Sequence, residues 1–258
     1  MNNIEIDKLL VLATETAKFS GNIIMSFYKK KILTEIKDDG SPLTKADLES
    51  NKFITKKLKE SNIPIVSEES IDLVKKNPIY WLIDPLDGTK DFLACNDEFT
   101  VNISLIQNNY PVIGVIYAPA LNELYISSKI TKTYRIKNKI KEYPKANPKS
   151  KNLVMARSRF HDNEKANLFY KSNNVSNSTS IGSALKYGRI AFSEVDVYPR
   201  YVGTSEWDTA AGQSILEASG GAMIDLLTGS RMKYGKINRR NNSFITFRHP
   251  YLLNDFKF

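Results

Sequence analysis

The sequence has a single cysteine, Cys95, and only two histidines in 258 residues. One cysteine excludes an internal disulfide and a thiolate metal cluster, because each needs at least two thiols. No stretch approaches the roughly 18 consecutive apolar residues that a membrane-spanning helix needs. The chain also starts with acidic residues, Glu5 and Asp7, ahead of a short apolar run, whereas a secretory signal starts with basic ones. We therefore expect a cytoplasmic protein in which Cys95 is a reduced thiol.

Acidic residues are fewer than basic residues in this chain. Lysine and arginine number 37 against 28 aspartates and glutamates, which gives a formal net charge of +9. This balance favours anionic partners, among them nucleotides, nucleic acids and anionic lipids. Most of the lysines are scattered, however, and the aromatic-basic motifs of RNA-binding modules are absent. We expect a small anionic partner and no stable nucleic-acid complex. Weak peripheral attachment to an inner membrane stays open, although no amphipathic anchor stands out.

A chain of 258 residues is longer than most single domains, so we expect two domains or one large layered unit. Apolar residues from Ile6 to Phe27 recur every three or four positions, which predicts a long helix packed along one face. Other apolar runs predict strands, and Asn108-Asn109 is typical of a hairpin turn. The predicted elements are helices at 6–27 and 46–59 and strands at 63–66, 79–83, 98–106, 111–120, 122–127 and 132–137.

A lysine- and proline-bearing stretch, 137–151, lacks apolar periodicity and is typical of a linker. We therefore predict two domains, 1–146 and 147–258. Beyond this stretch helix and strand patterns alternate, which favours a layered α/β half. The predicted elements there are strands at 152–156, 194–199 and 221–225 and helices at 162–171, 184–192 and 207–219.

The densest chemical pattern follows the apolar strand at 79–83. Asp84 and Asp87 stand three residues apart where that strand ends, with Pro85 between them to turn the chain. Two carboxylates and the Leu86 carbonyl form an all-oxygen set that suits magnesium, and a helix opening at Gly88 and Thr89 suits a phosphate. An Asx-rich turn with an ordinary helix cap explains the same residues equally well.

Two further acidic segments favour the metal site over the ordinary turn. Glu68 and Glu69 follow the short strand at 63–66, and Asp208 is placed in the first turn of the predicted helix at 207–219. Each feature alone is ordinary, since surface glutamates are solvated and aspartate at a helix start complements the dipole. Three distant acidic segments, each at the end of an element beside small residues, together indicate a site.

These three segments resemble the signatures of the lithium-sensitive, magnesium-dependent phosphatases of the inositol monophosphatase superfamily. The signatures are an acidic pair, DPxDGT after an apolar strand, and WDxAAG near the C-terminal end. Further stretches resemble more closely the 3′(2′),5′-bisphosphate nucleotidase branch of that superfamily. They lie at 41–47, 84–92, 97–106, 114–120, 182–187 and 197–200. The resemblance implies an α/β fold, a layered αβαβα sandwich of two halves with the site between them.

The same resemblance implies roles for individual residues. Two or three Mg²⁺ ions would bind Glu68, Asp84, the Leu86 carbonyl, Asp87 and Asp208. Gly88 and Thr89 would hold the scissile phosphate. Asp47 and Thr89, with Glu68 nearby, would orient the attacking water. Neither His161 nor His249 lies in a motif, so acid-base work by histidine is the weaker hypothesis.

Substrate choice depends on Ser183, Lys186 and Arg200, together with Asp208. Superfamily members that act on inositol phosphates resemble this chain near Asp208 but have a glutamate close to the position of Arg200. An arginine there favours a second phosphate, because the guanidinium binds phosphate in bidentate fashion. The alternative is that Lys186 and Arg200 are surface cations. Tyr187 and Tyr198 are expected in the core.

The expected reaction is removal of the 3′-phosphate from 3′-phosphoadenosine 5′-phosphate to give AMP and phosphate. The phosphosulfate 3′-phosphoadenosine 5′-phosphosulfate is an expected second substrate, which would connect the enzyme to sulfur metabolism. One alternative is an inositol monophosphatase or another sugar phosphatase, and short oligoribonucleotides are not excluded as substrates. Another is a basic RNA- or membrane-surface-binding protein with structural acidic clusters. Nothing in the sequence indicates an oligomeric state.

Overall fold

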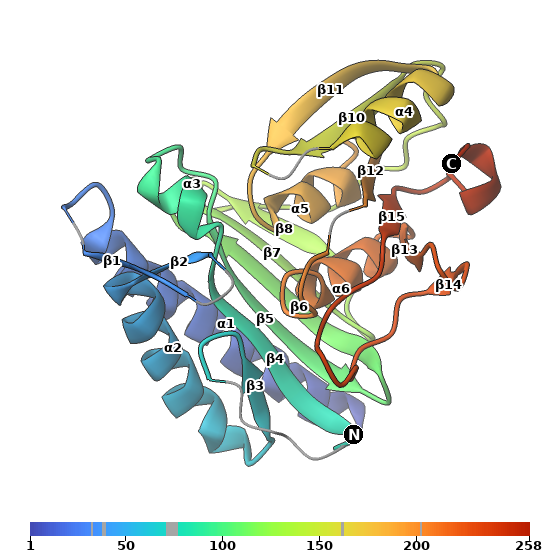
Figure 1. The fold of residues 1–258 in the computed structure, drawn as a ribbon. Coiled ribbons are helices and arrows are strands. Elements are labelled where there is room, and N and C mark those ends of the chain that lie inside the picture. The colour runs from blue at the N-terminus through green and yellow to red at the C-terminus, as the bar shows by residue number, and fades with distance from the viewer. Residues whose placement is uncertain (32, 38–39, 71–76, 161–162, 202) are drawn as a thin grey trace.

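The computed structural model describes residues 1–31, 33–37, 40–70, 77–160, 163–201 and 203–258. Helices and sheets alternate in layers, in the order α–β–α–β–α (Figure 1). This is the αβαβα sandwich that the resemblance implied. No helix in the described ranges is long and apolar enough to cross a membrane.

The first layer consists of α1 (Asn3–Phe27) and α2 (Lys45–Leu58). The Asn2 side chain accepts the Glu5 amide hydrogen bond while the Glu5 carboxylate accepts that of Asn2, a capping box that starts α1. The predicted apolar face of α1 is buried against the neighbouring sheet, with Ile6, Ala13 and Ile24 fully covered. Both long helices predicted for the first half are thus confirmed.

The second layer is a seven-stranded sheet in the order β3-β4-β5-β6-β7-β8-β9. Only β3 and β4 pair in parallel, and the other pairs are antiparallel. Helical layers cover both faces, which explains why these strands are continuous apolar runs. The bounds are β3 (Ile65–Ser67), β4 (Ile79–Asp87), β5 (Thr100–Gln107), β6 (Tyr110–Ala118), β7 (Glu123–Ser128), β8 (Tyr134–Lys137) and β9 (Ile140–Glu142), with the short helix η1 (Lys59–Ser61) before β3.

The central layer consists of α5 (Leu185–Ala191) and α6 (Ala210–Ala218), which lie between the two sheets (Figure 1). Their apolar side chains form one buried cluster with residues of both sheets. The contact with β6 is close, because a Cβ added at Gly114 would lie 2.5 Å from the Ala211 carbonyl oxygen. The two helices therefore pack against both sheets and connect the two halves of the chain through one hydrophobic core.

The fourth layer is a six-stranded sheet in the order β11-β10-β12-β15-β13-β14, and α4 (Glu164–Ser172) covers its outer face. β10 pairs in parallel with both β11 and β12, so the carboxyl ends of these three strands lie at the same edge. The bounds are β10 (Leu153–Ser158), β11 (Val175–Ile181), β12 (Val197–Arg200), β13 (Ala222–Asp225), β14 (Ser230–Arg231) and β15 (Phe244–Phe247), with η2 (Leu253–Asp255) near the end.

Several sequence predictions need correction. The helix predicted at 207–219 begins only at Ala210, so Asp208 precedes it instead of lying in its first turn. The predicted linker, 137–151, contains the edge strand β9. Unpredicted elements are β11 and β15 in the second sheet and the hairpin of β1 (Thr34–Ile36) and β2 (Pro42–Thr44). The short helix α3 (Thr89–Leu93) begins where the sequence predicted a helix start. The division into domains 1–146 and 147–258 stays a prediction.

Candidate active site

A cavity of about 400 Å³ lies where the two halves of the chain meet. On one side it is lined by the end of β4 and the start of α3. On the other it is lined by residues at the carboxyl ends of β10, β11 and β12 and by the loop that leads to α6. Ligands in α/β proteins bind at the carboxyl ends of parallel strands, so the topology itself indicates a binding site here.

The predicted metal ligands come together in this cavity. Five of the residues that line it are those named from the sequence: Glu68, Asp84, Leu86, Asp87 and Asp208. They come from three segments far apart in the chain. Their four carboxylates and the Leu86 carbonyl form a set of oxygen donors that suits a hard cation such as magnesium. Asp91 is a fifth acidic residue of the lining.

An irregularity in β4 brings Asp84 and Asp87 to the same side. Residues three apart on a regular strand point to opposite faces. Here Asp84 pairs with Asn102 and Asp87 with Thr100, so β4 has one residue more than β5 across this interval. Pro85 lies within the bulge, where a missing amide donor is tolerated. The bulge thus allows both carboxylates to line one cavity.

Each aspartate is held in place by neighbouring groups. Asp87 Oδ2 accepts hydrogen bonds from Asn102 Nδ2 at 3.1 Å and from the Ala184 amide at 2.5 Å. Asp208 Oδ2 accepts from the Ser205 amide at 2.8 Å. The bond from Ser205 orients Asp208 from within its own loop, so its position does not depend on α6.

The carboxylates also repel one another. Burial raises the pKa of Asp84 well above its usual range, and the charges of Glu68, Asp87 and Asp208 raise it further. Burial, with the charges of Asp87 and Glu68, also raises the pKa of Asp208. Burial raises the pKa of Asp87 to about 6, although Lys186 opposes the shift. Such a buried, like-charged set is stabilised by a bound cation.

The acidic pair contacts a cation of the chain itself. Lys37 Nζ, just after β1, lies 2.9 Å from Glu68 Oε1 and 2.5 Å from Glu69 Oε1. Within the described ranges, no three aspartate, glutamate, histidine or cysteine side chains form a group with ready metal-binding geometry. The donor chemistry fits magnesium, and the assignment of individual ligands stays a prediction.

Thr89 and Asp47 form a pair beside the carboxylates. Thr89 Oγ1 donates to Asp47 Oδ1 at 3.1 Å, and Asp47 Oδ2 accepts from the backbone and hydroxyl of Thr44 at 2.8 and 2.6 Å. Asp47 is 1% exposed and lies behind Thr89, which itself lines the cavity. Gly88 precedes α3 with φ of 85°, a left-handed conformation that favours glycine, and a helix begins at Thr89 as predicted.

The substrate-binding residues predicted in the second half of the chain lie in the same cavity. Ser183, Lys186 and Arg200 all line the cavity. Lys186 and Arg200 are 6% and 7% exposed, which contradicts the alternative that they are surface cations. Burial lowers the pKa of Lys186 to about 8, and its ammonium group lies 5.2 Å from the centre of the Tyr198 ring. Tyr198 is in the core between the sheets, as expected.

Some residues of the cavity were not predicted. Arg159 and Phe160 follow directly on β10, and Arg240 lies beside Ser205 in an isolated bridge. Arg159 pairs with Asp91 at 3.3 Å and with Glu98, so it connects the two walls. Residues that directly follow a parallel strand are candidates for a binding site. The sequence predicted the strand at 152–156 but not its parallel pairing, so Arg159 and Phe160 were not singled out.

The remaining candidates lie elsewhere. His249 does not line the cavity, and His161 lies outside the described residues. Cys95 is an exposed free thiol.

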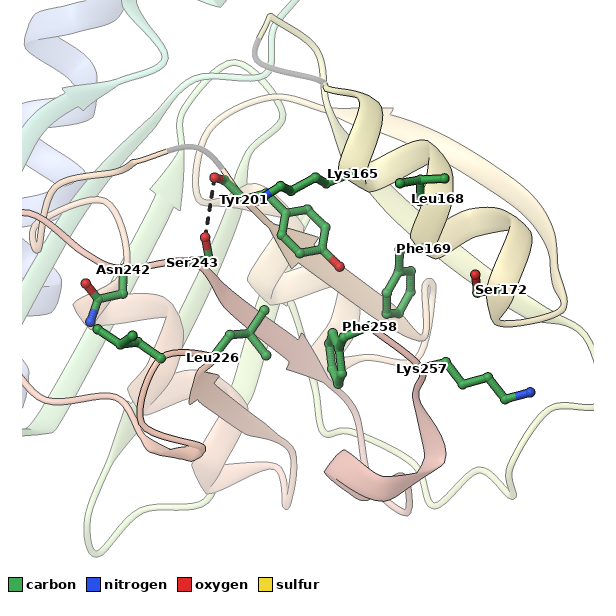
Figure 2. Close-up of a pocket in the computed structure, with 11 residues that line it drawn as sticks. Lys165, Leu168, Phe169, Ser172, Tyr201, Leu226, Asn242, Ser243, Lys257 and Phe258 are labelled. Carbon is green, nitrogen blue, oxygen red and sulfur yellow. Dashed lines mark hydrogen bonds between the residues drawn. The ribbon is translucent and has the colours of Figure 1, made fainter.

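A larger cavity of about 620 Å³ lies on the outer side of the second sheet, between α4 and the C-terminal residues. Figure 2 shows Tyr201, Phe169 and Phe258 around it. Its lining has no acidic side chain, so it offers no comparable metal site.

Comparisons with known proteins agree with this geometry. The family model described as "Inositol monophosphatase family" matches residues 5–243, and the chain therefore belongs to the inositol monophosphatase family. It is 37% identical over 241 residues to the 3′(2′),5′-bisphosphate nucleotidase CysQ of Buchnera aphidicola, covering 90% of this chain and 89% of the relative. It is 34% identical over 218 residues to CysQ of Escherichia coli strain K12, covering 82% and 88%.

A solved structure is also similar. The crystal structure of CysQ from Bacteroides thetaiotaomicron, described as a bacterial member of the inositol monophosphatase family, has a TM-score of 0.83 to this protein. The two chains are 33% identical, and the match covers 95% of this chain and 98% of the other. A Thermotoga maritima IMPase, 23% identical with a TM-score of 0.77, shares the fold.

Proposed function

We propose that this protein is a magnesium-dependent 3′(2′),5′-bisphosphate nucleotidase. It removes the 3′-phosphate of 3′-phosphoadenosine 5′-phosphate and releases AMP and phosphate. One observation carries the proposal: two buried cations, Lys186 and Arg200, share one cavity with the four carboxylates predicted to bind metal. A substrate with two phosphates matches this arrangement, since one phosphate needs the cation-binding carboxylates and the other needs fixed positive charge. The relatives named above are bisphosphate nucleotidases.

Glu68, Asp84, the Leu86 carbonyl, Asp87 and Asp208 would hold the magnesium ions. Magnesium bound there supplies Lewis-acid charge, which activates water and stabilises the leaving oxygen. Buried carboxylates of raised pKa lose their protons when a divalent cation binds, so the repulsion described above becomes binding energy. Two or three ions are expected from the family resemblance.

Thr89 and Asp47 would orient the attacking water. The Thr89 hydroxyl has two acceptors in reach, Asp47 Oδ1 at 3.1 Å and the Leu86 carbonyl at 3.2 Å. Donation to Asp47 would leave its oxygen lone pairs available as an acceptor for water. Asp47 is in turn fixed by Thr44, so the acceptor is held in one orientation. Gly88 and the backbone amide of Thr89 would contact the scissile phosphate.

Lys186 and Arg200 would bind the 5′ group of the substrate, with Ser183 beside them. The same cations suit a 5′-phosphosulfate, so 3′-phosphoadenosine 5′-phosphosulfate is the expected second substrate. Inositol 1-phosphate carries a single phosphate, so it has no second anionic group to pair with Lys186 and Arg200. The cavity therefore favours the nucleotide over inositol 1-phosphate.

The test is phosphate release from 3′-phosphoadenosine 5′-phosphate, inositol 1-phosphate and fructose 1,6-bisphosphate, measured with magnesium, without it, and with lithium added. We expect strong, magnesium-dependent preference for the nucleotide and inhibition by lithium. Preference for a sugar phosphate would leave the metal site in place and reject the substrate assignment. No release from any substrate would favour a binding protein, whose binding to RNA or anionic vesicles would be sensitive to salt.

An Arg200→Gln variant separates the substrates further. Glutamine removes the charge without adding a buried anion beside the carboxylates, which glutamate would do. We expect a loss of at least tenfold in kcat/KM for the bisphosphate nucleotide, while any hydrolysis of inositol 1-phosphate changes little. Equal losses for both substrates would show that Arg200 acts on the metal site instead.

A further inference from the structure

Four aromatic residues line the candidate active site, and one of them differs from the rest. Tyr187, Tyr198 and Trp207 are 3%, 3% and 8% exposed, and all three belong to the hydrophobic cluster between the two sheets. Phe160 is 44% exposed and belongs to none of the hydrophobic clusters that the described residues form. Burial in the core explains the first three rings, but it does not explain Phe160.

Phe160 lies at the mouth of the cavity. It comes two residues after Ser158, the last residue of β10, and the neighbouring strands β11 and β12 run parallel to β10. β10 and β12 pair at Met155 and Val197, so Ser158 and Arg200 each lie three residues beyond that pair. Ser158, two residues before Phe160, is therefore level with Arg200, and both Phe160 and Arg200 line the cavity.

The backbone before Phe160 is held in place by Arg159. The Arg159 guanidinium donates to the Ser180 carbonyl at 3.2 Å and pairs with Glu98, and its Nε lies 3.3 Å from Asp91. Asp91 itself accepts from Asn96 Nδ2 at 2.6 Å. These contacts come from both halves of the chain. The ring that follows is consequently presented from an anchored segment.

We propose that Phe160 stacks on the nucleobase of the substrate. The proposal rests on the function proposed above and adds the part of the substrate that neither the carboxylates nor the cations contact. With one phosphate at Asp84 and Asp87 and the other near Arg200, the base is the remaining apolar part of the ligand and needs a surface near the mouth. An aromatic ring binds the flat face of a base well, and a purine such as adenine offers two rings for overlap.

The decisive experiment measures binding and turnover in Phe160→Ala, Phe160→Leu and Phe160→Trp. Binding of the product AMP is measured by calorimetry in the presence of magnesium, and kcat and KM are measured with 3′-phosphoadenosine 5′-phosphate. We expect Phe160→Ala and Phe160→Leu to weaken AMP binding and raise KM about tenfold, with kcat within about twofold of wild type. Phe160→Trp should keep wild-type affinity, because it restores a stacking surface.

Two controls make the test specific. Phe258→Ala removes an exposed phenylalanine outside this cavity and should leave affinity unchanged. The abasic compound 1-deoxyribose 3,5-bisphosphate keeps both phosphates and lacks the base, so its binding should be equal in wild type and Phe160→Ala.

Several outcomes would overturn the inference. Wild-type affinity for AMP in Phe160→Leu or Phe160→Ala would show that no stacking surface is needed, and an equal loss for the abasic compound would assign Phe160 to cavity shape. If wild-type protein hydrolyses the nucleotide while Phe160→Ala behaves like it, the stacking inference fails and the proposed function stands. If wild type releases no phosphate from the nucleotide, the proposed function fails, and AMP calorimetry still decides whether Phe160 binds a base.

Discussion

The Thr89 hydroxyl donates to the Asp47 carboxylate at 3.1 Å, although the two residues are 42 positions apart in the chain. Asp47 comes from the first turn of α2 and Thr89 from the first residue of α3. Two helix starts thus meet beside the cavity, and the buried carboxylate lies directly behind the hydroxyl that lines it.

We expect Asp47→Asn to reduce kcat about 100-fold and to leave KM for 3′-phosphoadenosine 5′-phosphate nearly unchanged. The amide is a weaker acceptor than the carboxylate, so Thr89 is no longer fixed with its lone pairs toward the water. Steady-state kinetics checks both parameters. Glu49→Gln, on the same helix, is the matched control and should retain full activity. A rise in KM with unchanged kcat would mean that Asp47 contributes to substrate binding instead.

Asp87→Asn should nearly abolish turnover while the fold survives. The Asn102 and Ala184 donors that hold Asp87 can still contact one oxygen of an amide, but the charge that attracts magnesium is gone. Magnesium calorimetry and phosphate release are the two measurements, and circular dichroism checks the fold. Retention of more than about a tenth of the rate would contradict a role in metal binding, since such contacts supply several kcal/mol.

Gly114→Ala should destabilise the protein by about 2 kcal/mol. The new Cβ would lie 2.5 Å from the backbone oxygen of Ala211 and 2.6 Å from Ser214 Cβ, so α6 must move away from β6. Thermal unfolding measures the change. Gly203→Ala is the matched control, because a Cβ at that position meets nothing within 4 Å. Equal melting temperatures for the two variants would show that α6 shifts at no cost.

Stability should fall in acid partly because Glu123 loses its charge. This carboxylate is 2% exposed and accepts hydrogen bonds from Tyr125 at 2.8 Å and Arg189 at 3.0 Å, with Lys137 Nζ at 2.7 Å. Burial opposes its ionisation, but Lys137 and Arg189 together lower its pKa below the ordinary value of 4.5. The stabilisation is therefore complete above about pH 4.5 and is lost as the pH falls through the lower folded-state pKa.

Glu123→Gln tests this dependence. The variant should be about 2 kcal/mol less stable than wild type at pH 7, because it leaves Arg189 and Lys137 without their shared anion. The difference should shrink as the pH is lowered below 4.5, which urea unfolding at several pH values measures. A difference that stays constant down to pH 3 would show that the glutamine is destabilising for reasons of packing.

Much of the site could be predicted because its motifs are local. Asp84, Leu86 and Asp87 are the end of one strand, β4, whose apolar part at 79–83 is recognisable from its composition. What local sequence could not show is the bulge that brings Asp84 and Asp87 to one face, since it depends on pairing with β5. The resemblance, not the residue pattern, supplied the assignment of these carboxylates to one metal site.

Other features depend on contacts between distant segments. β11 reads VSNSTSI, whose polar residues give no strand pattern, and it exists because β10 pairs with it at the edge of the second sheet. Asp208 was placed inside a helix because the apolar run extends from Trp207, whereas its bond to the Ser205 amide holds it in the preceding loop. Phe160 could not be singled out, because only the folded chain shows which aromatic residues the core leaves exposed.

The cavity draws on two sheets, and its two kinds of binding group have different origins. The end of β4 supplies Asp84 and Asp87, while the ends of β10 and β12 supply Arg159, Phe160 and Arg200. Under the proposed function, most of the metal ligands and most of the residues that select the substrate are thus encoded in separate stretches of the gene. If those roles hold, a few codon changes after two strands would alter the substrate without disturbing the carboxylates that hold the metal.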